Sequence, residues 1–100
     1  MRIRLSPQAR DDLDAIWLYV ARESGSHALA TRVVGSVTGK FGLFAKFPYI
    51  GITLESELRP NVRTFPVNHY VIFYSVKSGE IRILRIIHAS RDAQAVFAED

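Results

Sequence analysis

The sequence predicts an α+β fold in which one sheet packs against a helical hairpin. Two stretches with apolar residues at helical spacing lie in the first half of the chain, between residues 7 and 46. Three stretches rich in β-branched and aromatic residues follow in the second half, separated by short turns. No repeat or linker interrupts the 100 residues, of which 48% are hydrophobic, so we expect a single domain spanning residues 1–100.

The first predicted element is a short strand, because polar and apolar residues alternate from Arg2 to Leu5. Ser6-Pro7 then opens a helix, since serine caps helix starts and proline suits the first helical position. Ser24-Gly25-Ser26 ends it. Acidic side chains near the start of a helix interact favourably with its dipole and usually face water. The acids expected to do so here are Asp11, Asp12 and Asp14. The stripe expected to face the core is Ala9, Leu13, Ile16, Trp17 and Val20.

A second helix is predicted from His27 to Lys46. Its apolar ridge comprises Leu29, Val33, Val37, Phe41 and Phe44. It also contains Gly35, Gly39 and Gly42, each unfavourable in a helix by about 1 kcal/mol relative to alanine. Because these glycines share one face, we expect a close approach between the two helices in a tight antiparallel hairpin. A second helix that is kinked or broken is the alternative.

The second half is predicted to form a three-stranded antiparallel meander in one sheet. Phe47 to Pro60 is expected to be a loop. The strands are Val62–Val67, Tyr70–Val76 and Ile81–Ile87, and Lys77-Ser78-Gly79-Glu80 forms the last turn. Pro66 places the first of them at an edge or a bulge, because proline cannot donate to the ladder. A short amphipathic tail, Arg91 to Phe97, closes the chain.

The last two predicted strands are apolar on both faces. Strict alternation places Arg85 in phase with Ile81, Ile83 and Ile87. The hairpin covers one face of the sheet, but no predicted element covers the other. An apolar groove left open in this way favours a bound partner protein.

Composition and charge narrow the classes of function. The net charge is +3, and residues 59–91 hold six lysines and arginines against the single acid Glu80, which favours an anionic or acidic partner. The sequence has no cysteine, and His27 and His69 lack companions at ligand spacing, so we expect no metal and no cofactor. No stretch approaches the ~18 apolar residues of a membrane span. We therefore expect a soluble cytoplasmic protein without membrane association.

Two stretches carry a resemblance to a known family. The first is Val62-Arg63-Thr64-Phe65-Pro66-Val67 with Tyr70-Val71-Ile72-Phe73-Tyr74, and the second runs from Ile81 to Asp92 with Arg85, His88 and Arg91. With the opening Leu5-Ser6-Pro7-Gln8-Ala9, these resemble the ParE/RelE toxin superfamily over nearly the whole chain, and ParE in particular. The resemblance implies the toxin of a type II toxin–antitoxin pair, also known as a plasmid stabilisation protein.

The resemblance also implies a mechanism and partners. ParE-like members inhibit DNA gyrase by protein contact, without catalysis of their own or direct DNA binding. A cognate antitoxin, of the ribbon-helix-helix type with a flexible C-terminal tail, forms a hetero-oligomer with the toxin. RelE-like members instead cleave messenger RNA on the ribosome, and an inactive chain that only binds its antitoxin is a third reading. The C-terminal residues 93–100 lack the tyrosine that such nucleases carry, which favours the gyrase inhibitor.

The candidate site residues fall into two sets. Target contact, or catalysis if the chain is a nuclease, is assigned to Arg63, Arg85, His88 and Arg91. Arg85 is either paired with an acid of the chain or held for a partner, and the candidate acids are Glu80, Asp92 and those of the first helix. His88 has a structural alternative, a bond to a carbonyl or to Asp92. Antitoxin binding is assigned to Trp17, Tyr19, Tyr74 and Arg82, although the aromatic residues also suit the core and Arg82 also suits a solvated surface.

Overall fold

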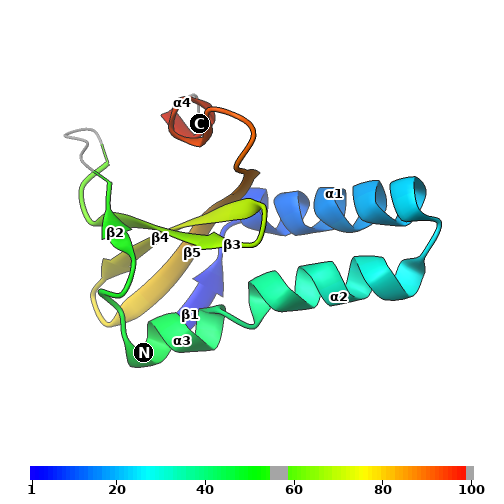
Figure 1. Ribbon diagram of the computed structural model, residues 1–100. Helices are drawn as coiled ribbons and strands as arrows, with labels where there is room; N and C mark the ends of the chain where they lie inside the picture. The colour runs from blue at the N-terminus through cyan, green and yellow to red at the C-terminus, as the bar shows by residue number, and fades with distance from the viewer. Residues whose placement is uncertain (55–58, 99–100) are drawn as a thin grey trace.

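The computed structural model describes residues 1–54 and 59–98. A five-stranded sheet has the order β1-β5-β4-β3-β2 (Figure 1). The strands are β1 (Arg2–Leu5), β2 (Ile52–Thr53), β3 (Val62–Val67), β4 (Tyr70–Lys77) and β5 (Glu80–His88). The helices are α1 (Pro7–Ser24), α2 (His27–Thr38), α3 (Phe41–Lys46) and α4 (Ala93–Ala98). The predicted α+β fold with its meander is confirmed; β1 pairs in parallel with β5, and the other pairings are antiparallel.

Local chemistry explains where these elements begin and end. The Ser6 hydroxyl accepts the Ala9 amide, and Gly25, with φ of 68°, ends α1 in the left-handed conformation. Ser26 caps α2 by accepting the Leu29 amide. Ser78 and Gly79 both have positive φ, which matches the two-residue turn that joins twisted antiparallel strands. These boundaries agree with the sequence prediction to within one residue.

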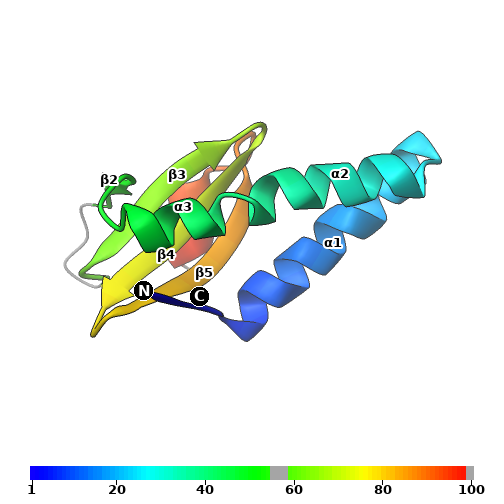
Figure 2. The ribbon, with the colours of Figure 1, turned by 90° about the horizontal axis from the view of Figure 1, so that it is seen from below.

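The predicted second helix is broken, so the alternative prediction of a kinked or broken helix is confirmed. α2 ends at Thr38, Gly39 and Lys40 interrupt it, and α3 begins at Phe41. Glycine destabilises a helix at this point, and the break allows Phe41 and Phe44 to be buried under the sheet. The expected close approach through the glycines is wrong, because a Cβ at Gly35 or Gly42 would meet open space. The antiparallel hairpin itself is present, and its far half projects beyond the sheet (Figure 2).

The main core lies between the sheet and the hairpin with α3. Its largest fully buried side chains are those of Phe44 and Tyr74, whose rings stack 4.2 Å apart. The predicted stripe of α1 is buried or half-buried, with Ala9 and Ile16 most enclosed. Leu29, at the start of the predicted ridge of the second helix, stays 37% exposed because the hairpin projects past the sheet there.

The opposite face of the sheet has a covering element of its own. The tail forms α4, and Phe97 stacks on Phe73 with ring centroids 4.5 Å apart. A second core of Val62, Phe73, Ile87 and Phe97 results. The expectation of an uncovered face was therefore wrong, because α4 packs on that face through Phe97, with Ala93 and Val96 beside it (Figure 1).

The predicted loop also contains structure. β2 pairs with β3 through Ile52 with Thr64 and Thr53 with Arg63. Pro66 of β3 lies beyond the two residues that pair with β2. Its lack of an amide N–H therefore removes no hydrogen bond from the β2–β3 pairing. The part of this loop over residues 55–58 lies outside the described residues. No helix among residues 1–54 and 59–98 is both long enough and apolar enough to cross a membrane.

Candidate functional site

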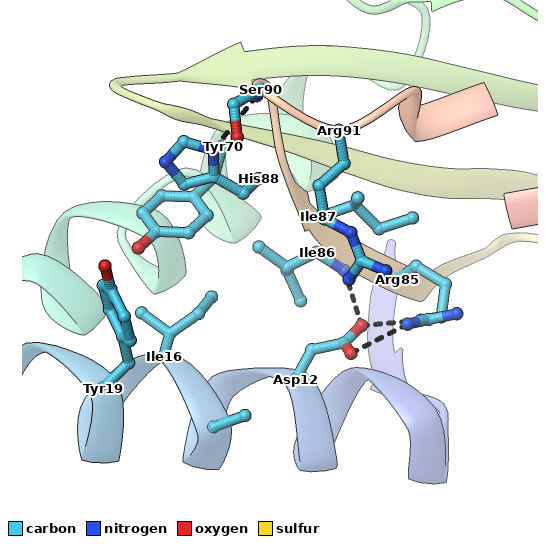
Figure 3. Close-up of a pocket in the computed structure, with 11 residues that line it drawn as sticks. Asp12, Ile16, Tyr19, Tyr70, Arg85, Ile86, Ile87, His88, Ser90 and Arg91 are labelled. Carbon is cyan, nitrogen blue, oxygen red and sulfur yellow. Dashed lines mark hydrogen bonds and ion pairs between the residues drawn. The ribbon is translucent and has the colours of Figure 1, made fainter. Parts of the chain in front are cut away.

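A groove of about 470 Å³ runs between α1 and the end of β5 (Figure 3). Its floor is apolar, and the side chains that we call the polar wall belong to Tyr19, Tyr70, His88, Ser90 and Arg91. The floor comprises Ala15, Ile16 and Ile86, Ile87 also borders the groove, and Asp12 and Arg85 lie at one end. Three of the four predicted contact residues thus line one groove: Arg85, His88 and Arg91.

The Arg85–Asp12 ion pair forms one end of the groove. Arg85 donates from Nε to Asp12 Oδ2 at 2.7 Å and from a terminal nitrogen to Oδ1 at 3.0 Å, a bidentate geometry. Both side chains are about 15% exposed. Arg85 therefore has an internal acid as its partner. The expectation that Asp12 faces water was wrong, whereas Asp11 and Asp14 are exposed as predicted.

The position of Asp12 follows from the short first strand. β1 ends at Leu5, so the edge of β5 beyond Ile83 has no neighbouring strand. The cap of α1 and α1 itself supply the missing partners: the Ser6 amide donates to the Ile83 carbonyl at 2.9 Å, and the Ser6 hydroxyl to the Leu84 carbonyl at 2.7 Å. Asp12 then accepts the Ile86 amide at 2.9 Å. The carboxylate thus closes a strand edge as well as pairing with Arg85.

A bulge in β5 changes which side chains share a face. Phe73 pairs with Arg85, but the next residue, Tyr74, pairs with Ile83, so the ladder shifts there. As a result Ile86 joins Ile81 and Ile83 in the main core, and Ile87 packs with Phe97 on the other face. The predicted phase of Arg85 with Ile81 and Ile83 was wrong, because strict alternation does not allow for the extra residue, whereas the phase with Ile87, on the same side of the bulge, holds.

Two tyrosines from different elements meet in the polar wall. Tyr19 is 62% exposed on α1 and Tyr70 is 8% exposed at the start of β4, and their hydroxyl groups point toward one another (Figure 3). Burial raises the pKa of the Tyr70 phenol, and the nearby Tyr19 phenol raises it further. Tyr70 is therefore a neutral hydrogen-bonding group at physiological pH.

His88 and Arg91 complete the polar wall. His88 Nδ1 accepts the Ser90 amide at 3.0 Å, and its ring packs edge-on against Tyr70 with centroids 5.2 Å apart. Asp92, the carboxylate considered as a partner of His88, instead accepts the Ala95 amide at the start of α4. Arg91 is exposed, and its side chain extends into the groove (Figure 3).

Arg63 lies outside this groove. It belongs to β3, which is separated from β5 by β4. Its guanidinium donates to the carbonyls of Tyr49 at 3.2 Å and Gly51 at 2.8 Å, and it lies 4.9 Å from the centre of the Tyr49 ring. Arg63 therefore holds the segment before β2 in place, and the four predicted contact residues do not form a single cluster.

The four residues assigned to antitoxin binding take different positions. Tyr74 is completely buried; its hydroxyl accepts the Gly51 amide at 2.9 Å and donates to the Pro48 carbonyl at 2.8 Å, so it offers no surface to a partner. Trp17 is half-buried and donates from its indole nitrogen to the Thr31 hydroxyl at 3.1 Å, which links α1 to α2. Arg82 is exposed beside Glu80, and Tyr19 lies in the polar wall.

Asp12 was among the candidate partners of Arg85 as one of the acids of the first helix, but its side chain was expected to face water. Its spacing from Ala9 and Ile16, three and four residues away, placed it on the buried side of α1, and this signal could have identified it. The described residues contain no group of three histidines, cysteines or acids that could hold a metal ion. The groove combines an apolar floor with hydrogen-bond donors and a cation, an arrangement suited to a protein segment with both apolar and acidic side chains.

Comparison with known proteins identifies the family and the relatives that this chain resembles. A family model described as "ParE toxin of type II toxin-antitoxin system, parDE" matches residues 3–93. Toxin ParE1 of Caulobacter vibrioides is 32% identical over 92 residues, covering 92% of this chain and 93% of that protein. Toxin ParE3 of the same organism is 30% identical over 76 residues, or 76% of this chain and 74% of that protein.

Solved structures agree with the sequence relatives. A chain of the chromosomal ParDE toxin–antitoxin system from P. aeruginosa superposes with a TM-score of 0.75 at 28% identity, covering 88% of this chain and 95% of that one. A chain of the RelBE2 toxin–antitoxin complex from Mycobacterium tuberculosis has a TM-score of 0.63 at 23% identity, covering 87% and 95%. The second likeness is one of fold alone.

The sheet order, the helical hairpin and the groove beside β5 define a small α+β protein with the fold found in ParDE and RelBE toxin–antitoxin systems. Within that class, the family match and the relatives that cover most of the chain identify the family. The chain belongs to the family of ParE toxins of type II toxin–antitoxin systems, as its sequence resemblance indicated.

Proposed function

We propose that this toxin arrests growth in the cytoplasm by binding DNA gyrase through protein contact. A cognate antitoxin, of the ribbon-helix-helix type with a flexible tail, neutralises it in a hetero-oligomeric complex. Support comes from the family and from the chemistry of the groove, whose polar wall suits a protein partner. The bidentate pairing of Arg85 with Asp12 is the observation that carries the non-catalytic reading.

The pairing matters because metal-free cleavage of RNA needs three groups together. A base must take the 2′-hydroxyl proton, a cation must stabilise the phosphate, and an acid must protonate the leaving oxygen. In this chain Asp12 engages Arg85, and Arg63 binds two carbonyls on another part of the sheet. Of the four candidates, His88 and Arg91 are left in the groove, which favours contact over catalysis.

Controlled expression in a bacterial host tests this proposal. Induced cells should stop dividing, form filaments and induce the DNA-damage response, with messenger RNA intact, and co-expression of the antitoxin should restore growth. Purified toxin should inhibit supercoiling by gyrase. Ile83→Asp, which places a charge in the core, serves as the unfolded control. Transcripts cut in phase with codons on ribosomes would establish the nuclease instead, and normal growth with folded toxin present would identify an inactive chain.

A further inference from the structure

We propose that the segment from Phe47 to Ile52, which leads from α3 into β2, contacts the target protein of the toxin through its exposed apolar side chains. These side chains, which we call the apolar patch, belong to Phe47, Tyr49, Ile50 and Ile52. The inference rests on the proposed function, because it names the surface through which gyrase is bound. The partner surface that fits is a preformed apolar pocket with acidic residues at its rim.

Exposed apolar side chains are concentrated in this segment (Figure 1). The four side chains of the apolar patch are between 44% and 72% exposed. Among the described residues, eight large hydrophobic side chains are exposed, and four of them belong to the patch. Six consecutive residues span at most about 20 Å, so one partner surface can contact all four side chains. A cluster of this kind on a small domain is typical of an interaction surface.

The backbone of the segment is fixed by two side chains of the sheet. The Tyr74 hydroxyl donates to the Pro48 carbonyl at 2.8 Å and accepts the Gly51 amide at 2.9 Å. Arg63 donates to the carbonyls of Tyr49 at 3.2 Å and Gly51 at 2.8 Å. The fold therefore holds the backbone in place while the apolar side chains stay exposed. A patch that is ordered in advance loses little conformational entropy when a partner binds.

The shape of the patch favours a folded partner. Side chains as exposed as Tyr49 and Ile52 project from the surface, whereas a flexible peptide recovers its ordering entropy by burying side chains in a groove. Strand addition by an extended peptide is also disfavoured, because β2 offers an edge of two residues. A folded protein with a pocket of its own satisfies the patch. The target is such a protein, and the flexible tail of an antitoxin is not.

A second copy of this chain fits the patch poorly. The four side chains present roughly 500 Å² of surface, judged from their exposed fractions and the ~150–250 Å² that a large side chain can bury. A stable interface buries about 800 Å² on each partner. Two projecting patches placed face to face would contact one another only at their tips. A larger partner can enclose the patch and extend the contact around it, which makes the patch the centre of a wider interface.

The charge beside the patch indicates the rim of the partner. Lys46 is exposed and directly precedes Phe47. Residues 40–54 include two lysines and no acid. Two copies related by a two-fold axis would bring these lysines together, and like charges repel. Acidic residues around an apolar pocket complement both the patch and its lysines, and they would also accelerate association.

Matched variants test the proposal. Tyr49→Ala and Ile52→Ala each shorten an exposed side chain of the patch, and Leu18→Ala makes the same kind of change at an exposed position of α1. Lys46→Glu reverses the charge beside the patch, and Arg22→Glu reverses an exposed charge in the last turn of α1. None of the five changes removes a core side chain, and unfolding curves verify that each variant is folded.

The measurement is the dissociation constant of each purified toxin for purified gyrase holoenzyme, together with the toxin concentration that halves supercoiling. Tyr49→Ala and Ile52→Ala should each raise both values at least about tenfold, as expected for side chains at the centre of an interface. Leu18→Ala and Arg22→Glu should change them by less than about twofold. Lys46→Glu should slow association and weaken its dependence on salt. Affinity for the antitoxin from the adjacent reading frame should stay within about twofold of the wild type in the patch variants.

The outcomes separate this inference from the proposed function. If Tyr49→Ala and Ile52→Ala inhibit gyrase as the wild type does, the patch is not the target surface, although the chain is still a gyrase inhibitor. If they lose antitoxin binding and keep inhibition, the patch belongs to the antitoxin interface and the inference is overturned. A wild-type dimer in sedimentation that these variants dissociate would assign the patch to a second copy and overturn it as well. A wild-type chain that neither binds nor inhibits gyrase would reject the proposed function itself.

Discussion

The groove beside β5 and the segment from Phe47 to Leu54 are stabilised by the same device but present opposite surfaces. In each, an arginine of the sheet binds a neighbouring part of the chain: Arg85 binds Asp12 of α1, and Arg63 binds the carbonyls of Tyr49 and Gly51. The groove then exposes donors and the cation Arg91. The segment exposes large apolar side chains, namely Phe47, Tyr49, Ile50 and Ile52.

This difference shows that a basic residue in a sheet does not by itself mark a contact surface. Two of the four predicted contact residues, Arg63 and Arg85, hold the fold together. The other two line the groove, where His88 is partly exposed and Arg91 is exposed. A guanidinium suits the structural role because its rigid fork satisfies several acceptors at once. Burial and hydrogen-bond partners therefore distinguish a scaffold arginine from a contact arginine, and charge does not.

The largest effect is expected in the second core, which supports the segment on one side of the sheet. Phe97→Ala removes a ring that is 2% exposed and stacked on Phe73, and Leu54 packs against the same cluster. The free energy of unfolding should fall by about 3–4 kcal/mol in urea denaturation. Ile52→Ala, at a position 72% exposed, is the control and should change it by less than about 0.5 kcal/mol. Equal losses would mean that α4 does not cover this face.

Gly51→Ala should be the next most damaging change, and it acts on the segment alone. A Cβ at Gly51 would lie 2.7 Å from the Tyr74 hydroxyl and 2.8 Å from the Thr64 carbonyl, and neither can move freely. We expect a loss of about 2 kcal/mol in stability, with antitoxin affinity of the folded protein unchanged. Gly42→Ala, where the added methyl group meets open space in α3, should be neutral or stabilising. If Gly51→Ala instead reduced antitoxin affinity, the two regions would share one interface.

Tyr74→Phe should have a smaller effect that depends on pH. Losing the hydroxyl leaves the Gly51 amide and the Pro48 carbonyl without this partner, which costs about 1–2 kcal/mol. Burial raises the pKa of the Tyr74 phenol above 10.0, although the Gly51 hydrogen bond and the Arg63 charge oppose the change. Because the unfolded chain then ionises first, wild-type stability is full below pH 10 and falls as the pH rises through the folded pKa. Urea titrations above pH 10 should show a shallower fall for Tyr74→Phe.

Much of the fold could be predicted from the sequence because its signals are local. Periodicity identified the helices and strands, and serine, proline and glycine marked their ends. The bulge at Leu84–Arg85, the pairing of β2 and the packing of α4 depend on partners far along the chain, and no local pattern encodes them. For the site, the sequence singled out Arg85, His88 and Arg91, which line the groove. It counted the acids of α1 among the candidate partners of Arg85 but expected Asp12 to face water, because an acid near the start of a helix usually does.

The most direct test of this account compares the unfolding free energies of Arg85→Ala and Arg91→Ala in urea. If Arg85 is part of the scaffold, its removal leaves Asp12 partly buried without its ion pair, and stability should fall by about 3 kcal/mol. Arg91→Ala should stay within about 0.5 kcal/mol of the wild type, since its side chain is exposed. An Arg85→Ala protein that unfolds like the wild type yet no longer arrests growth would contradict the account and make Arg85 a contact residue.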